Sequence, residues 1–229
     1  MIVLLLVLLN ILDIGLCNNH VLVMRYNKRN DCQNPLALIK PNKTFSEFTY
    51  CGKYNLRFLR NIILMDGANF DLRIFITDFE RKIGFLRYDG GSYLFDFKHQ
   101  NLNPDEWHHI CFSISINQLM IVLNGHILLN EKVDLVTKEI LNPGLWLGGT
   151  NSTSKRYLDR RFVGLITDVH LWSQSLTIAD IVSITETNTI SNTLFPDLFT
   201  WPKFRINSNT TCIEYFVMNL PILRSEVSK

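Results

Sequence analysis

Short apolar stretches separated by turn residues run from Phe45 to Trp201, and this pattern constrains the fold more than any other feature. Asp89-Gly90-Gly91 separates the run 82–88 from the run 93–97, and Asn124-Gly125 separates 118–123 from 127–129. Asp-Gly and Asn-Gly between two such runs are strong hairpin signals, because the tight turn needs residues that tolerate a positive φ. Many short strands with turns about every 8–12 residues predict an all-β sandwich or barrel.

Further apolar runs continue the strand pattern along the chain. They are Leu72–Ile76, Trp107–Ile116, Leu145–Leu147 and Val163–Trp172. Successive side chains of a strand point to opposite faces, so Cys111, Ser113 and Ser115 are expected to share one face.

One helix is expected to interrupt the strands. Thr177 can cap its start, and Asp180 follows three residues later, which is close to a capping box. Its apolar residues recur at helical spacing, and we expect it to end near Thr187 after two to three turns. The apolar face consists of Leu176, Ile178, Ile181, Val182 and Ile184.

The N-terminus predicts export. Residues 1–17 are apolar over the length of a signal-peptide core, which is too short to span a bilayer, and Gly15 and Cys17 are small enough for a cleavage site. The alternative is that this run forms a buried strand of the mature fold. We expect an irregular segment at 18–44, one domain at 45–206 and a tail at 207–229, with no membrane span. The predicted location is extracellular.

The cysteines and glycosylation sequons agree with export. Without Cys17 an even set of four remains, which suggests two disulfides but leaves three connectivities open. This set is Cys32, Cys51, Cys111 and Cys212. A zinc site is disfavoured because no closely paired C-x-x-C ligands are present. The N-x-S/T acceptors are Asn42, Asn151 and Asn209.

Several landmarks in order resemble the pentraxin family. The family signature His-x-Cys-x-Ser/Thr-Trp is matched by the run that starts at His109, with Ile114 where the family has Trp. The run 48–51 resembles the strand that carries the partner cysteine. The runs 163–172 and 198–201 resemble the later strands of the family, and the helix start follows at the expected place. The resemblance implies a two-sheet antiparallel jelly-roll β-sandwich of the concanavalin A-like class with one short C-terminal helix. Laminin-G-like domains share this fold.

The same resemblance implies how the cysteines pair. Cys51 and Cys111, 60 residues apart, are expected to pair across the sandwich. The first and last strands of such a jelly roll run near one another, so Cys32 and Cys212 are expected to form the second bond. The alternative is that one or both of these outer cysteines bond to another chain.

Pentraxins bind carbohydrate or phosphorylated ligands through calcium, which needs six to eight oxygen ligands. Here the corresponding positions leave Asp66, Asn69, Asp71, Thr150 and Asn151 as possible ligands. The acidic run that the family carries after Leu-Gly is absent, and a glycan on Asn151 would obstruct the site. The alternative is that these are ordinary turn residues, so we expect a degenerate site and do not carry over a calcium cofactor.

Patterns typical of enzymes are absent. The Glu-x-Asp-x-x-Glu pattern of jelly-roll glucanases does not occur, and Glu131 and Asp134 would lie on opposite faces of a strand. Adjacent His108 and His109 would also point opposite ways and cannot chelate one metal together. Asp105-Glu106 is expected to be a solvated turn, and no Gly-x-Ser-x-Gly elbow is present. We therefore expect no enzymatic activity.

The resemblance and the exported character together predict a pentraxin-like recognition protein, such as a factor of innate immunity. The expected partners are carbohydrate, phosphorylated ligands or protein surfaces, and the domain can form a homo-oligomer. The net charge of +2 without a long basic run does not point to nucleic acid. The alternative is an interaction module of an adhesion or receptor ectodomain with no small ligand of its own.

Overall fold

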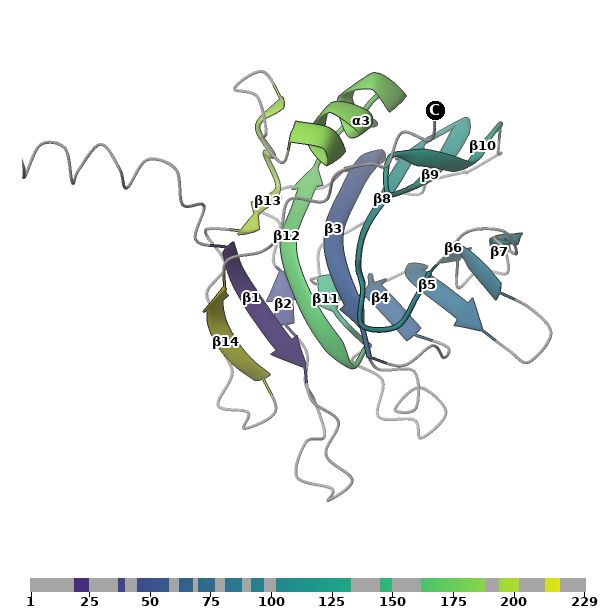
Figure 1. The fold of residues 1–229 in the computed structure, drawn as a ribbon. Helices are drawn as coiled ribbons and strands as arrows, with labels where there is room; N and C mark the ends of the chain where they lie inside the picture. The colour runs from purple at the N-terminus through teal and green to yellow at the C-terminus, as the bar shows by residue number, and fades with distance from the viewer. Residues whose placement is uncertain are drawn as a thin grey trace, which may run out of the picture.

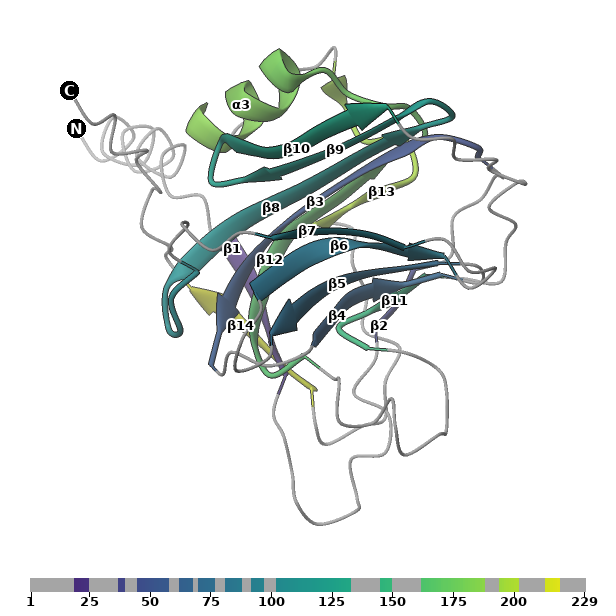
Figure 2. The same cartoon turned by 90° about the vertical axis from the view of Figure 1, so that its right-hand side faces the viewer.

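The chain folds into two antiparallel β-sheets stacked face to face, with helix α3 (Ile178–Thr187) on the outside. The computed structural model describes residues 19–24, 37–39, 45–57, 62–67, 70–76, 81–87, 92–96, 102–132, 145–149, 162–187, 194–201 and 213–218. Figure 2 shows the three layers, with helix α3 above the first sheet and the second sheet beneath it. The expected all-β, two-sheet antiparallel sandwich of the concanavalin A-like class is confirmed.

The first sheet has eight strands in the order β10-β9-β8-β3-β12-β1-β14, and β13 pairs with β12. Its strands are β1 (Asn19–Met24), β3 (Phe48–Leu56), β8 (Trp107–Ser115), β9 (Gln118–Leu123), β10 (His126–Lys132), β12 (Gly164–Trp172), β13 (Phe199–Thr200) and β14 (Ile213–Met218). The predicted turn at Asn124-Gly125 joins β9 to β10, and both residues have a positive φ of 50° and 82°. This hairpin is therefore confirmed.

The second sheet has six strands in the order β2-β11-β4-β5-β6-β7. Its strands are β2 (Ala37–Ile39), β4 (Ile62–Asp66), β5 (Phe70–Ile76), β6 (Arg81–Arg87), β7 (Ser92–Asp96) and β11 (Leu145–Leu147). β6 and β7 pair up to Leu86 opposite Ser92, as the predicted hairpin requires. The turn residues between them lie outside the described part of the chain.

Alternation along β3 and β8 fills the space between the sheets. Phe48, Tyr50 and Tyr54 of β3 face the second sheet together with Ile110 and Phe112 of β8, and all five are fully buried. Each such large apolar side chain contributes about 1.5–3 kcal/mol through removal from water. The intervening residues of both strands therefore face the opposite side of the first sheet.

A second, smaller apolar cluster lies between the first sheet and α3 (Ile178–Thr187). It consists of Cys51, Cys111, Met120, Val122, Trp172, Leu176, Ile181 and Ile184. Figure 1 shows α3 lying across the end of the sheet formed by β12, β3 and β8. The helix thus covers part of the sheet surface that faces away from the main core.

The structure differs from the sequence expectation at both ends of the chain. β1 and β2 lie in the segment 18–44 that was expected to be irregular, and β14 lies in the expected tail. β1 is inserted between β12 and β14, with Leu22 opposite both Ile166 and Tyr215. These strands exist because of partners far away in sequence, so the local pattern did not reveal them. The predicted leader at 1–17 lies outside the described residues.

The helix begins as the sequence predicts. The backbone N–H of Asp180 donates to Oγ1 of Thr177 at 3.3 Å, and the backbone N–H of Thr177 donates to Oδ2 of Asp180 at 3.1 Å. This reciprocal pair is a capping box that satisfies two backbone donors at the helix start. Within the described residues, no helix is both long and apolar enough to cross a membrane.

Thr177→Ala is expected to lower the free energy of unfolding by about 1 kcal/mol, because the N-cap acceptor is lost. Urea denaturation followed by circular dichroism measures the change. Ser183→Ala is the matched control, since Ser183 is an exposed residue of the same helix and alanine has the higher helix propensity. Equal losses in the two variants would contradict a specific role of the cap.

Candidate functional site

The register of the second sheet brings the predicted ligand region together. Asp66 of β4 lies opposite Asp71 of β5 on one side and opposite Trp146 of β11 on the other. Cross-strand partners share one face of a sheet, so the three positions form a row. Asp71 is placed here by the backbone register alone. Asn69, Thr150 and Asn151 lie outside the described residues, as do the other sequons at Asn42 and Asn209, so these predictions remain predictions.

This row lies on the outer face of the second sheet. Leu145 and Leu147 belong to the main core, so Trp146 between them points away from it, and its side chain is half-buried. Asp66 is 5% exposed, which means that its carboxylate is largely withdrawn from solvent. The backbone N–H of Gly148 donates to the carbonyl of Leu64 at 2.8 Å and fixes the end of β11 against β4.

The outer face of the first sheet carries a polar cluster that the sequence did not predict. It consists of Lys53, His109, Asp168, His170 and Thr200. Nζ of Lys53 on β3 lies 2.8 Å from Oδ2 of Asp168 on β12, and the Lys53 side chain is 7% exposed. A register shift between Thr167 and His170 accommodates Asp168, whose φ is 50°. The resulting bulge turns the carboxylate toward the lysine. Nδ1 of His170 lies 3.2 Å from Oγ1 of Thr200 beside this ion pair.

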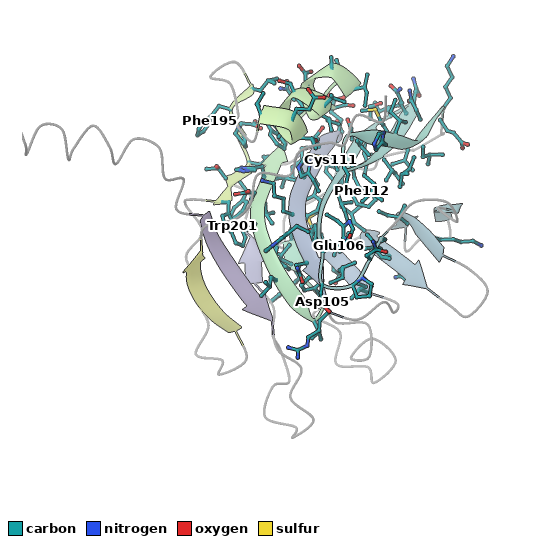
Figure 3. The ribbon with its side chains drawn as sticks, viewed as in Figure 1. Asp105, Glu106, Cys111, Phe112, Phe195 and Trp201 are labelled. Atoms are coloured by element: carbon teal, nitrogen blue, oxygen red, sulfur yellow. A yellow bond between two sulfur atoms is a disulfide. The ribbon has the colours of Figure 1, made fainter. Side chains whose placement is uncertain are left out.

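Cys51 and Cys111 form a disulfide, as the resemblance implies. The expectation that it crosses the sandwich is wrong, because the two residues are directly opposite on neighbouring strands of the first sheet, with Cα atoms 4.1 Å apart. Both side chains belong to the cluster under α3 rather than to the main core. Figure 3 labels Cys111 near this helix. Cys32 and Cys212 lie outside the described residues, so their pairing remains a prediction.

His109 is held between the helix and the disulfide. Its Nδ1 lies 2.7 Å from Oγ1 of Thr185, and that hydroxyl donates its single proton to the carbonyl of Ile181 at 2.9 Å. The hydroxyl therefore accepts from Nδ1–H, which leaves Nε2 as an unprotonated acceptor. Nε2 lies 3.7 Å from Sγ of Cys111.

His108 points to the opposite face, as alternation predicts. Its Nε2 lies 2.9 Å from the carbonyl oxygen of Asn103. The two adjacent histidines therefore point to opposite faces of β8, as predicted. Ser113 also lies on the predicted face with Cys111, because its hydroxyl donates to the carbonyl of Leu176 at 3.0 Å.

Three groups that are capable of binding a metal meet on this face. The ligand atoms of Cys51, His109 and Cys111 all lie within 4.8 Å of one another, and all three residues are buried. The sequence argument missed this set because it looked for C-x-x-C. The available signal was His-x-Cys on a strand, which places both side chains on one face. With the disulfide formed, the sulfur atoms are not thiolates and do not bind zinc.

Burial keeps the cluster histidines neutral. Removal from water lowers the pKa of His109 to about 3, and the positive charges of Lys53 and a protonated His170 add to this effect. Burial also lowers the pKa of His170 to about 4, partly opposed by the Asp168 carboxylate. Both imidazoles are therefore uncharged near pH 7.

Acidification is expected to destabilise the fold through these histidines. Below pH 6.5 the unfolded chain binds protons that the folded chain does not, so the free energy of unfolding falls as pH falls, down to the folded pKa values near 3 to 4. One fully buried histidine contributes a slope of about 1.4 kcal/mol per pH unit. Urea titrations between pH 6.5 and 4.5 should show a shallower slope in His109→Gln than in the wild type. Parallel slopes would contradict the assignment.

The carboxylates weighed as possible catalysts lie elsewhere. Figure 3 shows Asp105 and Glu106 at the end of the first sheet, away from Cys111. Both are exposed, and Oε2 of Glu106 accepts from Nδ2 of Asn103 at 2.9 Å, as in an ordinary polar turn. Glu131 is exposed on β10, and Asp134 lies outside the described residues.

Comparison with known proteins connects this architecture to a family. The sequence profile described as the concanavalin A-like lectin/glucanases superfamily matches residues 39–182. No curated protein matches the chain by sequence.

Solved structures share the fold at low sequence identity. The chain is similar to a heptameric SAP-like pentraxin from Limulus polyphemus, with a TM-score of 0.70 and 12% identity over 87% of this chain and 95% of that one. It is also similar to a "putative carbohydrate binding protein" from Bacteroides ovatus, with a TM-score of 0.59 and 18% identity over 90% of this chain and 60% of that one. The extracellular region of zebrafish Gpr126/Adgrg6 gives a TM-score of 0.53 and 12% identity over 80% of this chain and 24% of that one.

Proposed function

The chain belongs to the concanavalin A-like lectin/glucanase superfamily, and from this premise we propose that it is an extracellular, non-catalytic recognition domain that binds carbohydrate. The observation that carries the proposal is the family match over residues 39–182 on a two-sheet sandwich. The structural likeness to a pentraxin supports a pentraxin-like recognition role. The disulfide supports an oxidising, extracellular location.

We place the binding surface on the outer face of the second sheet, around Trp146. A sugar ring offers an apolar C–H face that packs against an indole, and hydroxyl groups that donate to carboxylates. The register puts the backbone positions of Asp66 and Asp71 in one row with Trp146, whose half-buried indole supplies the stacking group.

The first test is a glycan array probed with the full chain in millimolar calcium and again in EDTA. Retention of a defined set of glycans in both conditions is the expected result, with no cleavage of the bound glycans on incubation. Binding that disappears in EDTA would contradict a calcium-independent site. Release of new reducing ends would contradict the non-catalytic role.

Calcium is expected to have little effect on stability. Calcium takes six to eight oxygen ligands, and only Asp66 and Asp71 supply carboxylates among the positions considered. A ligand at a hundred times its Kd would stabilise the native state by about 2.7 kcal/mol. Differential scanning fluorimetry with millimolar calcium and with EDTA should give the same Tm. A rise of several degrees in calcium would contradict the prediction.

A second candidate function is an interaction module of a receptor or adhesion ectodomain. The observation that favours it is the structural likeness to part of the Gpr126/Adgrg6 extracellular region. This function predicts that no glycan on the array binds the chain. It also predicts saturable binding to cell surfaces that persists after the glycans have been removed enzymatically. Loss of cell binding after that treatment would favour the carbohydrate proposal.

A further inference from the structure

Carbohydrate recognition at the second sheet gives no role to one ring nitrogen of the polar cluster on the first sheet. Nε2 of His109 is an unprotonated acceptor, held in place from behind by Thr185, on a side chain that is 3% exposed. The group in front of it is Sγ of Cys111, which carries no proton in the disulfide. Within the described part of the chain, this ring nitrogen therefore faces the sulfur atoms of Cys51 and Cys111, and the three potential ligand atoms lie within 4.8 Å of one another.

We propose that reduction of the Cys51–Cys111 disulfide converts this cluster into a zinc site formed by two thiolates and Nε2 of His109. Thiolate and imidazole groups are the ligands that zinc prefers. A water molecule or an anion can complete the tetrahedron. The site is independent of the carbohydrate surface, because it lies on the first sheet.

The conversion balances with an external reductant. A phosphine or dithiol supplies two electrons that break the sulfur–sulfur bond. With a phosphine, one water provides its oxygen to the phosphine oxide and its two protons to the sulfur atoms. Binding of Zn²⁺ then releases these two protons, because the thiolate is the metal ligand.

One ligand distance in the oxidised fold, between nitrogen and sulfur, already matches that of a zinc site. Zn–S bonds of about 2.3 Å and Zn–N bonds of about 2.0–2.1 Å place tetrahedral sulfur and nitrogen ligands roughly 3.6 Å apart. Nε2 of His109 and Sγ of Cys111 are 3.7 Å apart. Cys51 is the cross-strand neighbour of Cys111, so opening the disulfide leaves its sulfur beside the same point.

The surroundings of His109 match those of a metal ligand. Metal-binding histidines almost always donate their other ring N–H to a fixed acceptor, which sets the tautomer and the ring orientation. Thr185 of α3 is the fixed acceptor for Nδ1–H of His109, because its own hydroxyl proton is donated to the carbonyl of Ile181. Thr185 is thus a positioning residue for the proposed site.

Access to the cluster depends on α3. Ile181 and Ile184 of the helix pack on the disulfide side of the sheet, and both cysteines are fully buried. Zinc is therefore expected to enter when the helix separates from the sheet or while the reduced chain folds. The experiment uses refolding for this reason.

The test is refolding of the denatured full chain under inert gas, with a phosphine reductant and with zinc or cobalt. A phosphine is chosen because dithiols bind zinc themselves. Zinc is expected to raise the Tm of the reduced wild type and not of the oxidised protein. Cobalt should give the visible spectrum of a tetrahedral site with sulfur-to-cobalt charge transfer. Competition with a chromophoric chelator gives the zinc affinity.

Matched variants distinguish zinc binding at this site from zinc binding by other cysteines of the chain. Every variant keeps all cysteines, so a loss of affinity is due to the changed residue. Thr185→Val removes the group that orients His109 and should lower the zinc affinity by about 10–100-fold. His109→Gln removes a ligand itself, so its loss of zinc affinity should be larger. His108→Gln is the control, because that ring points to the other face of β8.

Two results would overturn the proposal. One is equal zinc affinity in the wild type and His109→Gln, which would assign the metal to the remaining cysteines. The other is a reduced chain that does not fold even with zinc, because the three ligands would then not be held together. A reduced chain that folds only with zinc, and not as His109→Gln, would support the proposal.

Discussion

Replacing both Cys51 and Cys111 with alanine is expected to lower the free energy of unfolding by about 4 kcal/mol. The bond closes a loop of 60 residues, and in the chain-entropy account a loop of this size restricts the unfolded chain by about that amount. The two sulfur atoms also belong to the cluster under α3, so their removal loses packing as well. Urea unfolding of the oxidised wild type and the double variant gives the difference.

The single variants are the matched control for this prediction. Cys51→Ala and Cys111→Ala each remove the same bond, so each should cost nearly as much as the double variant, and the three losses should be strongly non-additive. Single losses that sum to the double loss would show that packing at each site, and not the bond, holds this face together.

Gly164→Ala is expected to cost about 3 kcal/mol or more, since two effects act at one position. Gly164 begins β12 with a φ of 151°, which side chains of L-residues rarely adopt. A Cβ atom there would come within 2.0 Å of the backbone oxygen of Asn55 on the neighbouring strand β3. Backbone cannot move aside without breaking the pairing of β12 with β3. The free energy of unfolding in urea measures the loss.

Gly125→Ala is the control that separates the cost of a positive φ from the cost of a steric clash with the neighbouring strand. Gly125 has a φ of 82° in the β9–β10 turn, but the nearest atom to an added Cβ is Cγ2 of Thr185 at 3.8 Å, an ordinary contact. This variant should therefore show the cost of the backbone conformation alone, about 1 kcal/mol. Equal losses at the two glycines would contradict the close approach of β12 to β3.

Features with a local cause could be predicted from the sequence. Turn residues located the Asn124-Gly125 hairpin, and the three-residue spacing of Thr177 and Asp180 located the helix start. Alternation along β8 placed His108 and His109 on opposite faces. In each case the local structure is determined by residues that are close together in the sequence.

Features that depend on distant partners could not be predicted in this way. β1 becomes a strand because β12 and β14 lie on either side of it. The disulfide lies within one sheet because β3 and β8 are neighbours with Cys51 and Cys111 in register.

The polar cluster has the same kind of origin. It depends on a bulge at Asp168 and on a helix that returns over the sheet to His109. Register and bulges are set by tertiary packing, so the sequence gives little local signal of them.

Titration of the strongest array glycan into the chain in EDTA tests the central claim most directly, that this sandwich recognises carbohydrate at the second sheet. We expect saturable binding to the wild type and a loss of affinity of at least about tenfold in Trp146→Ala, the effect of removing about 1.4 kcal/mol of stacking and contact. Circular dichroism confirms that the variant is folded. Absence of binding to any glycan, or equal affinity in the two proteins, would contradict the account.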